Sequence, residues 1–322
     1  MAVNTLFTWG PANVDTLLAT TLSVFTDKEL NDNIFSGIPT WYYLNEKNRV
    51  TKSGGASLLV RLMYQKNSTA QFYSGYDILD VTPQEGLTVA QFKWGRAASS
   101  ITISGQEQDQ NSGEAEVADL LKDKVEQSMM SITDLAGRQL YAAANNTKAV
   151  ANLPLFVDAT STIGDVNSST NSWWQAQVKA SGSFAAQGTS DWRNVYNTLT
   201  VQGQKMQAPP DFGVTTQTVF EAYEASLVPQ LRFANNKLGD AGFENLKFKN
   251  MTLMFDPNVP SGECYFLSSD ALKLVVHSKR NFARTPMVKP ANQDALTGQI
   301  IWMGQLTTNN RRKLAKFTGM TA

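Results

Sequence analysis

One uninterrupted stretch of helical periodicity, residues 111–145, constrains the fold of this chain more than any other feature. Asn111 and Glu114 have the spacing of a capping box, and Asn145-Asn146 follow the last turn. Apolar residues recur in steps of three and four, at Val117, Leu120, Leu121, Val125, Met129, Ile132, Leu135, Ala136 and Leu140. That spacing places one apolar stripe along a helix. About 30 helical residues would form a rod of roughly 45 Å, whose stripe has to be covered.

The stripe predicts which side chains of this helix are buried. We expect its core to consist of Val117, Leu121, Val125 and Ile132. Lys122 and Glu126 lie one turn apart on the side where solvent is expected. One half of a coiled coil is the alternative, but the stripe is broader than the seam of a strict heptad. A single spanning helix that packs on its own chain is therefore favoured.

The composition predicts a globular protein of two to three subdomains. The chain has 322 residues, of which 42% are hydrophobic and 17% are charged. Its formal net charge is zero, which disfavours tight autonomous binding to nucleic acid. A single cysteine, Cys264, excludes an intramolecular disulfide framework and fits a reducing compartment. Neither a signal peptide nor an apolar run of membrane-spanning length is found.

The N-terminal part predicts an arm that is anchored to a body. Residues 1–12 resemble an extended segment, and Asn13 can cap a short helix over residues 14–25. So short a helix does not persist alone and must dock on something. A dense apolar and aromatic patch follows between Ile34 and Leu44, and we expect it to anchor the arm.

After Gly54-Gly55, the periodicity changes from that of a helix to that of strands. Alternation over residues 58–64 and again over 87–104 predicts two strands separated by about 20 polar or irregular residues. Leu58, Val60 and Leu62 share one face of this long hairpin, whereas Leu59 and Met63 share the other.

A lone two-stranded hairpin is marginal in water, so it needs a surface to lie on. Its own subunit can cover only part of a ribbon with two apolar faces, and we expect a neighbouring subunit to cover the rest. The residues expected to contact other subunits are Leu58, Val60, Leu62, Tyr64, Phe72, Tyr73, Phe92 and Trp94.

The second half of the chain predicts an α+β sheet with flanking helices. Helices are expected over residues 191–205 and 218–227, and strands over 212–215, 248–255, 264–267, 272–277, 300–306 and 314–317. Residues 158–190 are rich in small polar residues, as in a surface loop. Trp173-Trp174 interrupts them and is expected to plug a local core.

No catalytic, metal or cofactor site is predicted, and we expect the chain not to be an enzyme. His277 is the single histidine, so with one cysteine it cannot form a zinc site of the usual type. The sequence lacks a nucleophile elbow, a dinucleotide-binding glycine motif and a phosphate loop. Carboxylates at the start of the long helix are explained by capping and solvation.

Basic residues gather in two places near the C-terminus. One group is Lys273, Lys279, Arg280, Arg284 and Lys289, and the other is Arg311, Arg312, Lys313 and Lys316. Neither is interleaved with aromatic residues in the manner of a base-stacking surface. Each is interpreted as a solvated face, with a shallow positive surface turned toward something anionic as the alternative.

Several segments, taken in order, form a recognisable series: Asp15-Thr16-Leu17-Leu18, Gly54-Gly55, Phe92-Lys93-Trp94, residues 101–105, Asn111-Ser112-Gly113, residues 171–174, residues 261–267 and residues 309–319. Together they resemble the major capsid proteins of tailed phages with the HK97-type fold. The resemblance covers nearly the whole chain. Gly164-Asp165 departs from the family, in which a second glycine would be expected.

The resemblance implies an α+β capsid fold with five parts. They are an N-terminal arm (1–49), an extended loop (50–105), a peripheral domain with the spine helix (106–150), an axial domain (151–265) and a return to the peripheral domain (266–322). It also implies hexamers and pentamers of an icosahedral shell around double-stranded DNA, assembled in the host cytoplasm. Expected partners are a portal protein, loosely held DNA and a separate scaffolding protein, because the chain begins directly at the arm.

An encapsulin-like nanocompartment would share this fold and enclose a cargo enzyme, so it remains the alternative. An enzyme of an unrecognised class is the alternative from outside shell proteins, and the scarcity of histidine counts against it.

Overall fold

The computed structural model describes residues 37–110, 114–202, 209–227 and 246–321, with side chains over 37–107 and from 121 onward. The helices are α2 Pro39–Lys47, α3 Gly105–Gln110, α4 Glu114–Leu140, α5 Leu153–Phe156, α6 Thr189–Val201 and α7 Gln217–Leu227, with short turns η1 Ser172–Trp174, η2 Phe184–Gly188 and η5 Arg311–Lys313. The strands are β1 Arg49–Lys52, β2 Ser57–Met63, β3 Leu87–Lys93, β4 Gly95–Ser104, β5 Thr162–Ile163, β6 Val166–Asn167, β7 Gln177–Ala180, β8 Phe212–Thr215, β9 Leu246–Phe248, β10 Met251–Phe255, β11 Cys264–Leu267, β12 Leu272–His277, β13 Ala283–Arg284, β14 Ala295–Thr308 and β15 Ala315–Thr318.

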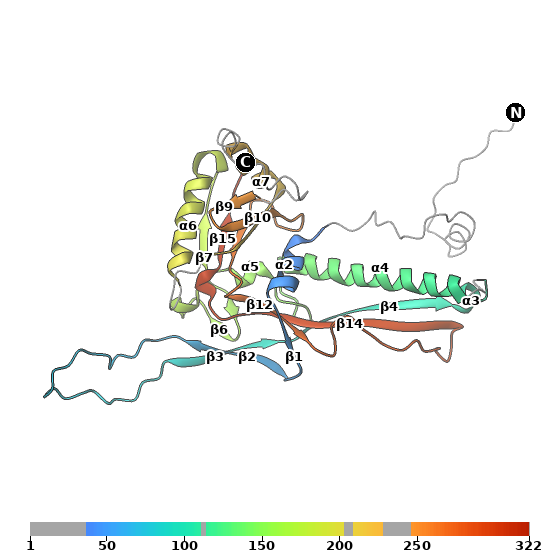
Figure 1. The fold of residues 1–322 in the computed structure, drawn as a ribbon, viewed down its shortest axis with the longest axis horizontal. Helices are drawn as coiled ribbons and strands as arrows, with labels where there is room; N and C mark the ends of the chain where they lie inside the picture. The colour runs from blue at the N-terminus through green and yellow to red at the C-terminus, as the bar shows by residue number, and fades with distance from the viewer. Residues whose placement is uncertain (1–36, 111–113, 203–208, 228–245, 322) are drawn as a thin grey trace.

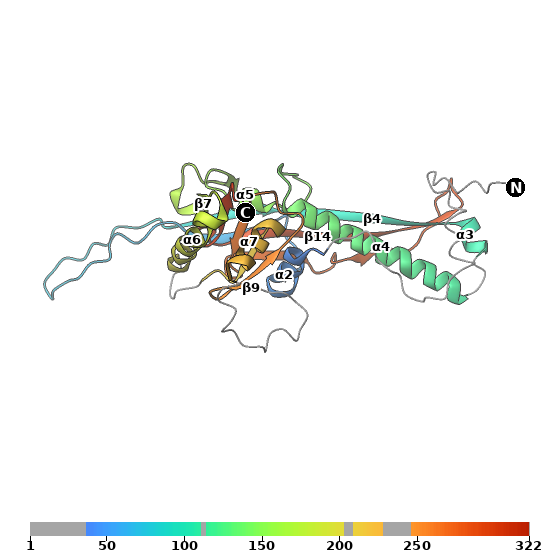
Figure 2. The same cartoon turned by 90° about the horizontal axis from the view of Figure 1, so that it is seen from above.

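The long helix α4 lies along an equally long pair of strands (Figures 1 and 2). Strand β14 pairs antiparallel with β4 from Ala295–Ser104 to Gly304–Gly95, and β12 and β13 also pair with β14. Val125 and Ile132 of α4 are 7% and 1% exposed, and Leu121 packs against the same core. Val125 and Ile132 are buried on the predicted stripe, and Leu121 is partly buried there. Val117 belongs to α4, but its side chain lies outside the described ones.

The helix is shorter than predicted at its C-terminal end. It has 27 residues and ends at Leu140, five residues before the predicted Asn145. The next residue, Tyr141, leaves the helix and is 4% exposed in the core, where its hydroxyl lies 2.8 Å from that of Thr40. Burial of this tyrosine determines the end of the helix, and the asparagines come after the turn. The predicted cap Asn111 lies outside the described residues.

The other large unit is a six-stranded sheet in the order β7-β15-β11-β8-β10-β9. Strand β11 is fully buried on both faces, so its side chains belong to two different cores. Tyr265 and Leu267 point into the core shared with α4 and the ribbon. Cys264 and Phe266 point into a second core, which α6 and α7 cover with Trp192, Val195, Tyr196, Leu199, Val219, Phe220 and Tyr223.

Three predicted strands, over residues 212–215, 264–267 and 272–277, are confirmed at both ends. The strand predicted over 248–255 is two strands, because Lys249 adopts a positive φ of 53° in the turn between them. Helix α6 begins two residues before its predicted start, and α7 begins at Gln217. Helix α2 and strand β1 were not predicted, and the helix expected over 14–25 lies outside the described residues.

The strand predicted over 87–104 is also broken, and the break directs the chain into two sheets. The indole Nε1 of Trp94 donates to the carbonyl of Gly55 at 2.9 Å, which fixes the end of β3. At Gly95 the backbone approaches that of Ala149 so closely that a Cβ atom would lie 2.6 Å from its carbonyl carbon. Only glycine permits that approach. Strand β4 therefore leaves the ribbon and joins β14.

The five predicted parts stay a prediction, and the sheets join strands across their boundaries. Residues 50–105 were predicted to form one extended loop, but β4 pairs with β14 in the five-stranded sheet. Residues 266–322 were predicted to return to the peripheral domain, but β15 pairs with β7 and β11 in the six-stranded sheet. Pairing between strands that are distant in the sequence determines which sheet each segment joins. Periodicity within a segment does not show which strand it pairs with.

Helix α2 is anchored by aromatic contacts to both units. Trp41 is 3% exposed and meets Trp302 of β14 edge-on, with ring centroids 5.3 Å apart. Tyr43 stacks on Phe212 of β8, and its hydroxyl donates to Asp211 at 2.7 Å. Burial, together with the Asp211 carboxylate, raises the pKa of Tyr43 far above its usual value, so the phenol keeps its proton. Of the predicted anchoring patch, Ile38, Trp41 and Leu44 are buried in the core, whereas Tyr42 is 57% exposed; that the patch anchors the arm stays a prediction.

The interpretation of the second basic cluster as a solvated face is wrong for Arg311, because the side chain of this residue is completely buried. Its guanidinium donates to the carbonyls of Leu155, Phe156, Asp158 and Ser161 and to the hydroxyls of Ser161 and Ser168. It also lies over the ring of Trp174, 5.9 Å from the centroid. Burial lowers the pKa of Arg311 to about 10, which leaves it charged at neutral pH. This one side chain fastens residues 155–168 to the C-terminal segment.

Replacement of Val125 tests the register of α4. Val125→Asp puts a carboxylate on the buried stripe, where an unpaired charge costs several kcal/mol, comparable to the stability of a whole domain. We expect loss of soluble folded protein. Lys122 is exposed, so Lys122→Ala should change the midpoint of thermal unfolding very little. Circular dichroism and solubility measure both, and equal tolerance at the two positions would refute the assigned register.

Replacement of Arg311 tests the buried guanidinium. Arg311→Met leaves the carbonyls of residues 155–161 without donors, and we expect a loss of about 3–5 kcal/mol in the free energy of unfolding. Arg284→Met removes an exposed arginine and serves as the matched control, with an expected change within about 0.5 kcal/mol. Denaturant unfolding measures both. Indistinguishable midpoints of denaturant unfolding for the two variants would show that Arg311 does not stabilise the fold.

Candidate assembly surfaces

The ribbon of β2 and β3 has one face against its own subunit. The strands pair antiparallel from Ser57–Lys93 to Met63–Leu87. Leu58, Leu62 and Phe92 are 2%, 3% and 5% exposed, and the ring of Phe92 lies 6.0 Å from that of Phe156. Trp94, at 9%, is buried nearby. These four residues were expected to contact other subunits, but the subunit's own core already covers them.

A small hairpin holds the ribbon in place, and it contains the unusual Gly164-Asp165 pair. Both residues have positive φ angles, 64° and 63°, in the turn between β5 and β6. A Cβ atom at Gly164 would lie 2.8 Å from the Cβ atom of Ala90, and the Gly164 carbonyl accepts from Gln91 N–H at 3.0 Å. Glycine is required where the turn touches the ribbon, whereas aspartate tolerates the left-handed region.

The opposite face of the ribbon is uncovered. Leu59, Met63, Leu87 and Val89 are 58%, 65%, 73% and 47% exposed. Met63 and Leu87 are direct cross-strand partners, so their side chains form one continuous apolar surface. The predicted alternation is confirmed, and the residues open to a neighbour lie on the face of Leu59 and Met63.

Beyond the ribbon, residues 65–86 form a distal loop that extends away from the body (Figures 1 and 2). Its large apolar side chains are exposed: Phe72 107%, Tyr73 67%, Tyr76 102%, Ile78 95% and Val81 89%. Phe72 and Tyr73 are thus open to a neighbour, as the sequence led us to expect. The described side chains of the loop make hydrogen bonds only within the loop, as in the pairs Ser68–Gln84 and Asp80–Thr82.

Val60 and Tyr64 are intermediate between the buried residues of the ribbon and the exposed residues of the distal loop. Val60 is half-buried against the core, and the ring of Tyr64 lies 5.7 Å from that of Trp173. Trp174 is 1% exposed and donates from its indole to the Ile163 carbonyl at 3.0 Å, which confirms it as a core plug. The double tryptophan therefore supports, on its own subunit, the end of the ribbon where the distal loop begins.

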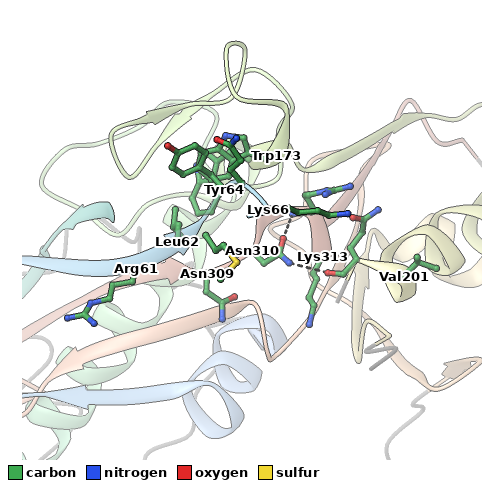
Figure 3. Close-up of a pocket in the computed structure, with 14 residues that line it drawn as sticks. Arg61, Leu62, Tyr64, Lys66, Trp173, Val201, Asn309, Asn310 and Lys313 are labelled. Carbon is green, nitrogen blue, oxygen red and sulfur yellow. Dashed lines mark hydrogen bonds between the residues drawn. The ribbon is translucent and has the colours of Figure 1, made fainter. Parts of the chain in front are cut away.

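A cavity of about 600 Å³ opens at the base of the distal loop, where the ribbon ends (Figure 3). Its lining comes from β2 with the start of the distal loop, η1, the end of α6 and the segment around η5. The charged residues that line it are Arg61, Lys66, Arg312 and Lys313. Arg312 and Lys313 belong to the second basic cluster of the sequence, for which a positive surface was the alternative interpretation, and no sequence signal indicated that Arg61 and Lys66 would join them.

The described residues contain no cluster of three or more histidine, cysteine or acidic side chains able to hold a metal. Cys264 is fully buried, and burial raises the pKa of its thiol far above the usual value, so the thiolate is suppressed. His277 lies edge-on to Trp94, with ring centroids 5.8 Å apart. Within the described segments, no helix is long and apolar enough to span a bilayer.

No family model and no curated protein sequence matches the chain. Solved structures do match it over nearly its full length. The capsid of cyanophage A-1(L) matches with a TM-score of 0.70 at 13% identity, over 95% of this chain and 99% of that one. The chain has the HK97-type capsid fold. The capsid of a native GTA particle matches with a TM-score of 0.61 at 8% identity, over 97% and 100% of the two chains.

A shell of another kind shares the fold. The holo-SrpI encapsulin complex of Synechococcus elongatus matches with a TM-score of 0.57 at 8% identity, over 95% of each chain. The HK97-type fold therefore leaves open what such a shell would enclose.

Shortening the distal loop tests its role. The Tyr64 N–H donates to the Gly86 carbonyl at 3.0 Å, so residues 66–85 lie beyond the last bond of the ribbon. Replacing them with a short Gly-Ser turn should leave a soluble subunit with native circular dichroism, while assembly into particles fails. Unfolding of the shortened chain would place the loop in the subunit's own core. Normal, stable particles would show that the loop joins no subunits.

Proposed function

We propose that this chain is the major capsid protein of a tailed double-stranded DNA phage. In this proposal it assembles into hexamers and pentamers of an icosahedral shell. The observation that carries the proposal is the match to capsid structures over 95% and 97% of this chain. A fold built from parts that protrude from the subunit is suited to a shell, because such parts are covered only by other subunits.

The uncovered ribbon face supports this proposal on physical grounds. Full burial of a leucine, valine or methionine side chain contributes about 1.5–3 kcal/mol. The four outward side chains are each about half exposed or more, so a neighbour that covers them would contribute several kcal/mol. Exposed apolar side chains that gather on one face, as these do around Arg61, mark an interaction site.

In this proposal, each part of the fold corresponds to one part of a capsid subunit. The six-stranded sheet with α6 and α7 is the axial domain, and α4 with the five-stranded sheet is the peripheral domain. The ribbon and the distal loop are the extended loop. Subunit contacts then use Leu59, Met63, Phe72, Tyr73 and their neighbours, whereas Leu58, Leu62, Phe92 and Trp94 support the ribbon from within.

The proposed shell also implies partners other than its own copies. These are a separate scaffolding protein, a portal protein at one vertex and packaged DNA. A net charge of zero suits loose contact with DNA, since release of the genome requires that the wall hold it weakly. The mature location is the virion, after assembly in the host cytoplasm.

An encapsulin-like compartment is the second candidate, and the match to the SrpI complex favours it as the alternative. In that case the shell encloses a cargo protein. Both candidates predict closed particles, and the contents separate them.

Expression of the chain, alone and with phage scaffolding protein, tests the proposal. We expect closed icosahedral particles in electron micrographs and light scattering. Particles from infected cells should contain nuclease-protected double-stranded DNA. A chain that stays a 35.4 kDa monomer under all these conditions would refute a shell function. Particles filled with one cargo protein and free of DNA would favour the encapsulin alternative.

A further inference from the structure

The charges around the cavity at the base of the distal loop are all of one sign. Arg61, Lys66 and Arg312 are exposed, and no carboxylate of the described chain pairs with them. Lys313 lies 3.9 Å from Asp270, which is a weak pairing at that distance. None of the 14 lining residues is acidic. Four cations in one hollow repel each other, and a negatively charged occupant would relieve that repulsion.

The rim of this cavity is apolar as well as positive. Met63 and Val201 line it and are 65% and 70% exposed, and Tyr64 and Trp173 form its aromatic side (Figure 3). The fitting occupant therefore carries carboxylates together with apolar or aromatic side chains. A bare phosphate chain would use the cations and leave the apolar rim in water.

The distal loop of this same chain has that chemistry. Between residues 67 and 86 it carries Asp77, Asp80 and Glu85 and no cation. Asp77 accepts from Ser74 N–H at 2.6 Å, and Asp80 accepts from Thr82 N–H at 2.9 Å, so two carboxylates are held in fixed turns. Phe72, Tyr76 and Ile78 beside them are fully exposed or nearly so.

We propose that the distal loop of one subunit docks, through Asp77 and Asp80, in the basic cavity at the base of the next subunit's distal loop. The loop extends away from its own body in both views, so its tip does not reach its own cavity (Figures 1 and 2). A contact from the tip of one copy to the base of another joins two different surfaces. Such a head-to-tail contact closes into a ring when its rotation permits. This inference rests on the proposed shell function and assigns it a specific pair of surfaces.

Paired cysteines test the contact directly. Cys264 is fully buried, so an introduced pair dominates disulfide formation. Subunits with Asp77→Cys and Arg312→Cys, assembled and then oxidised, should give a ladder of covalent oligomers up to the hexamer on a non-reducing gel. The control is Asp77→Cys with Lys122→Cys, whose second position is exposed on α4. Well-formed particles without a ladder, or an equal ladder from the control, would overturn the proposal.

Charge reversal tests the energetic part. Asp77→Lys with Asp80→Lys, or Arg61→Glu with Arg312→Glu, should each lower particle yield by about tenfold or more, because charges that meet across an interface become alike. Combining all four changes should restore particles, and circular dichroism should stay native throughout. Failure of the combination to restore yield would overturn the pairing. Loss of packaged nucleic acid at normal particle yield would assign the cavity to nucleic acid instead.

The shell function and the docking contact would be refuted by different results. If the unmodified chain forms no particles under any condition, the shell function itself is refuted. If it forms particles whose yield is unchanged by every substitution at Asp77, Asp80, Arg61 and Arg312, the docking contact is refuted and the shell function is not.

Discussion

The pairing of β14 with β4 is the constraint on which the rest of the structure depends. The two strands come from residues 95–104 and 295–308, so the ladder joins distant parts of the chain. A two-stranded ladder that runs beyond the rest of its sheet leaves a face uncovered, and such a ladder is marginal in water. The stripe of α4 supplies the cover with Val125 and Ile132. Helix α2 then fixes this layer to the six-stranded sheet through Trp41 and Tyr43.

Sequence periodicity predicted those helices and strands whose hydrophobic pattern does not depend on which element they pack against. The stripe of α4 and the alternation of β2 follow from local chemistry alone, because each presents one face to any core that covers it. Strands β8, β11 and β12 were found because short apolar runs between turn signals are typical of buried strands. Where a single residue redirects the chain, as Trp94 does between β3 and β4, a local pattern could not show the break.

The candidate surfaces were harder to predict, for two physical reasons. Alternation shows that a ribbon has two faces but not which face its own subunit covers, so Leu58 and Leu62 were assigned to a neighbour and lie in the core. A basic run shows charge but not burial. Arg311 lies beside exposed Arg312, yet six donor–acceptor contacts hold its guanidinium inside the protein. Its carbonyl partners carry no side-chain signal that a sequence could show.

In the proposed shell, a subunit has to be stable alone and still present surfaces that only a neighbour covers. Its inner ribbon face is fixed by packing on Phe156 and by the turn at Gly164, so the ribbon does not depend on a neighbour to keep its shape. The apolar outer face and the distal loop therefore arrive preformed at an encounter, which lowers the entropy lost on binding. A neutral chain that separates its charges, with acids at the loop tip and cations at the base, can favour one relative orientation of two copies without a net charge that would keep them apart.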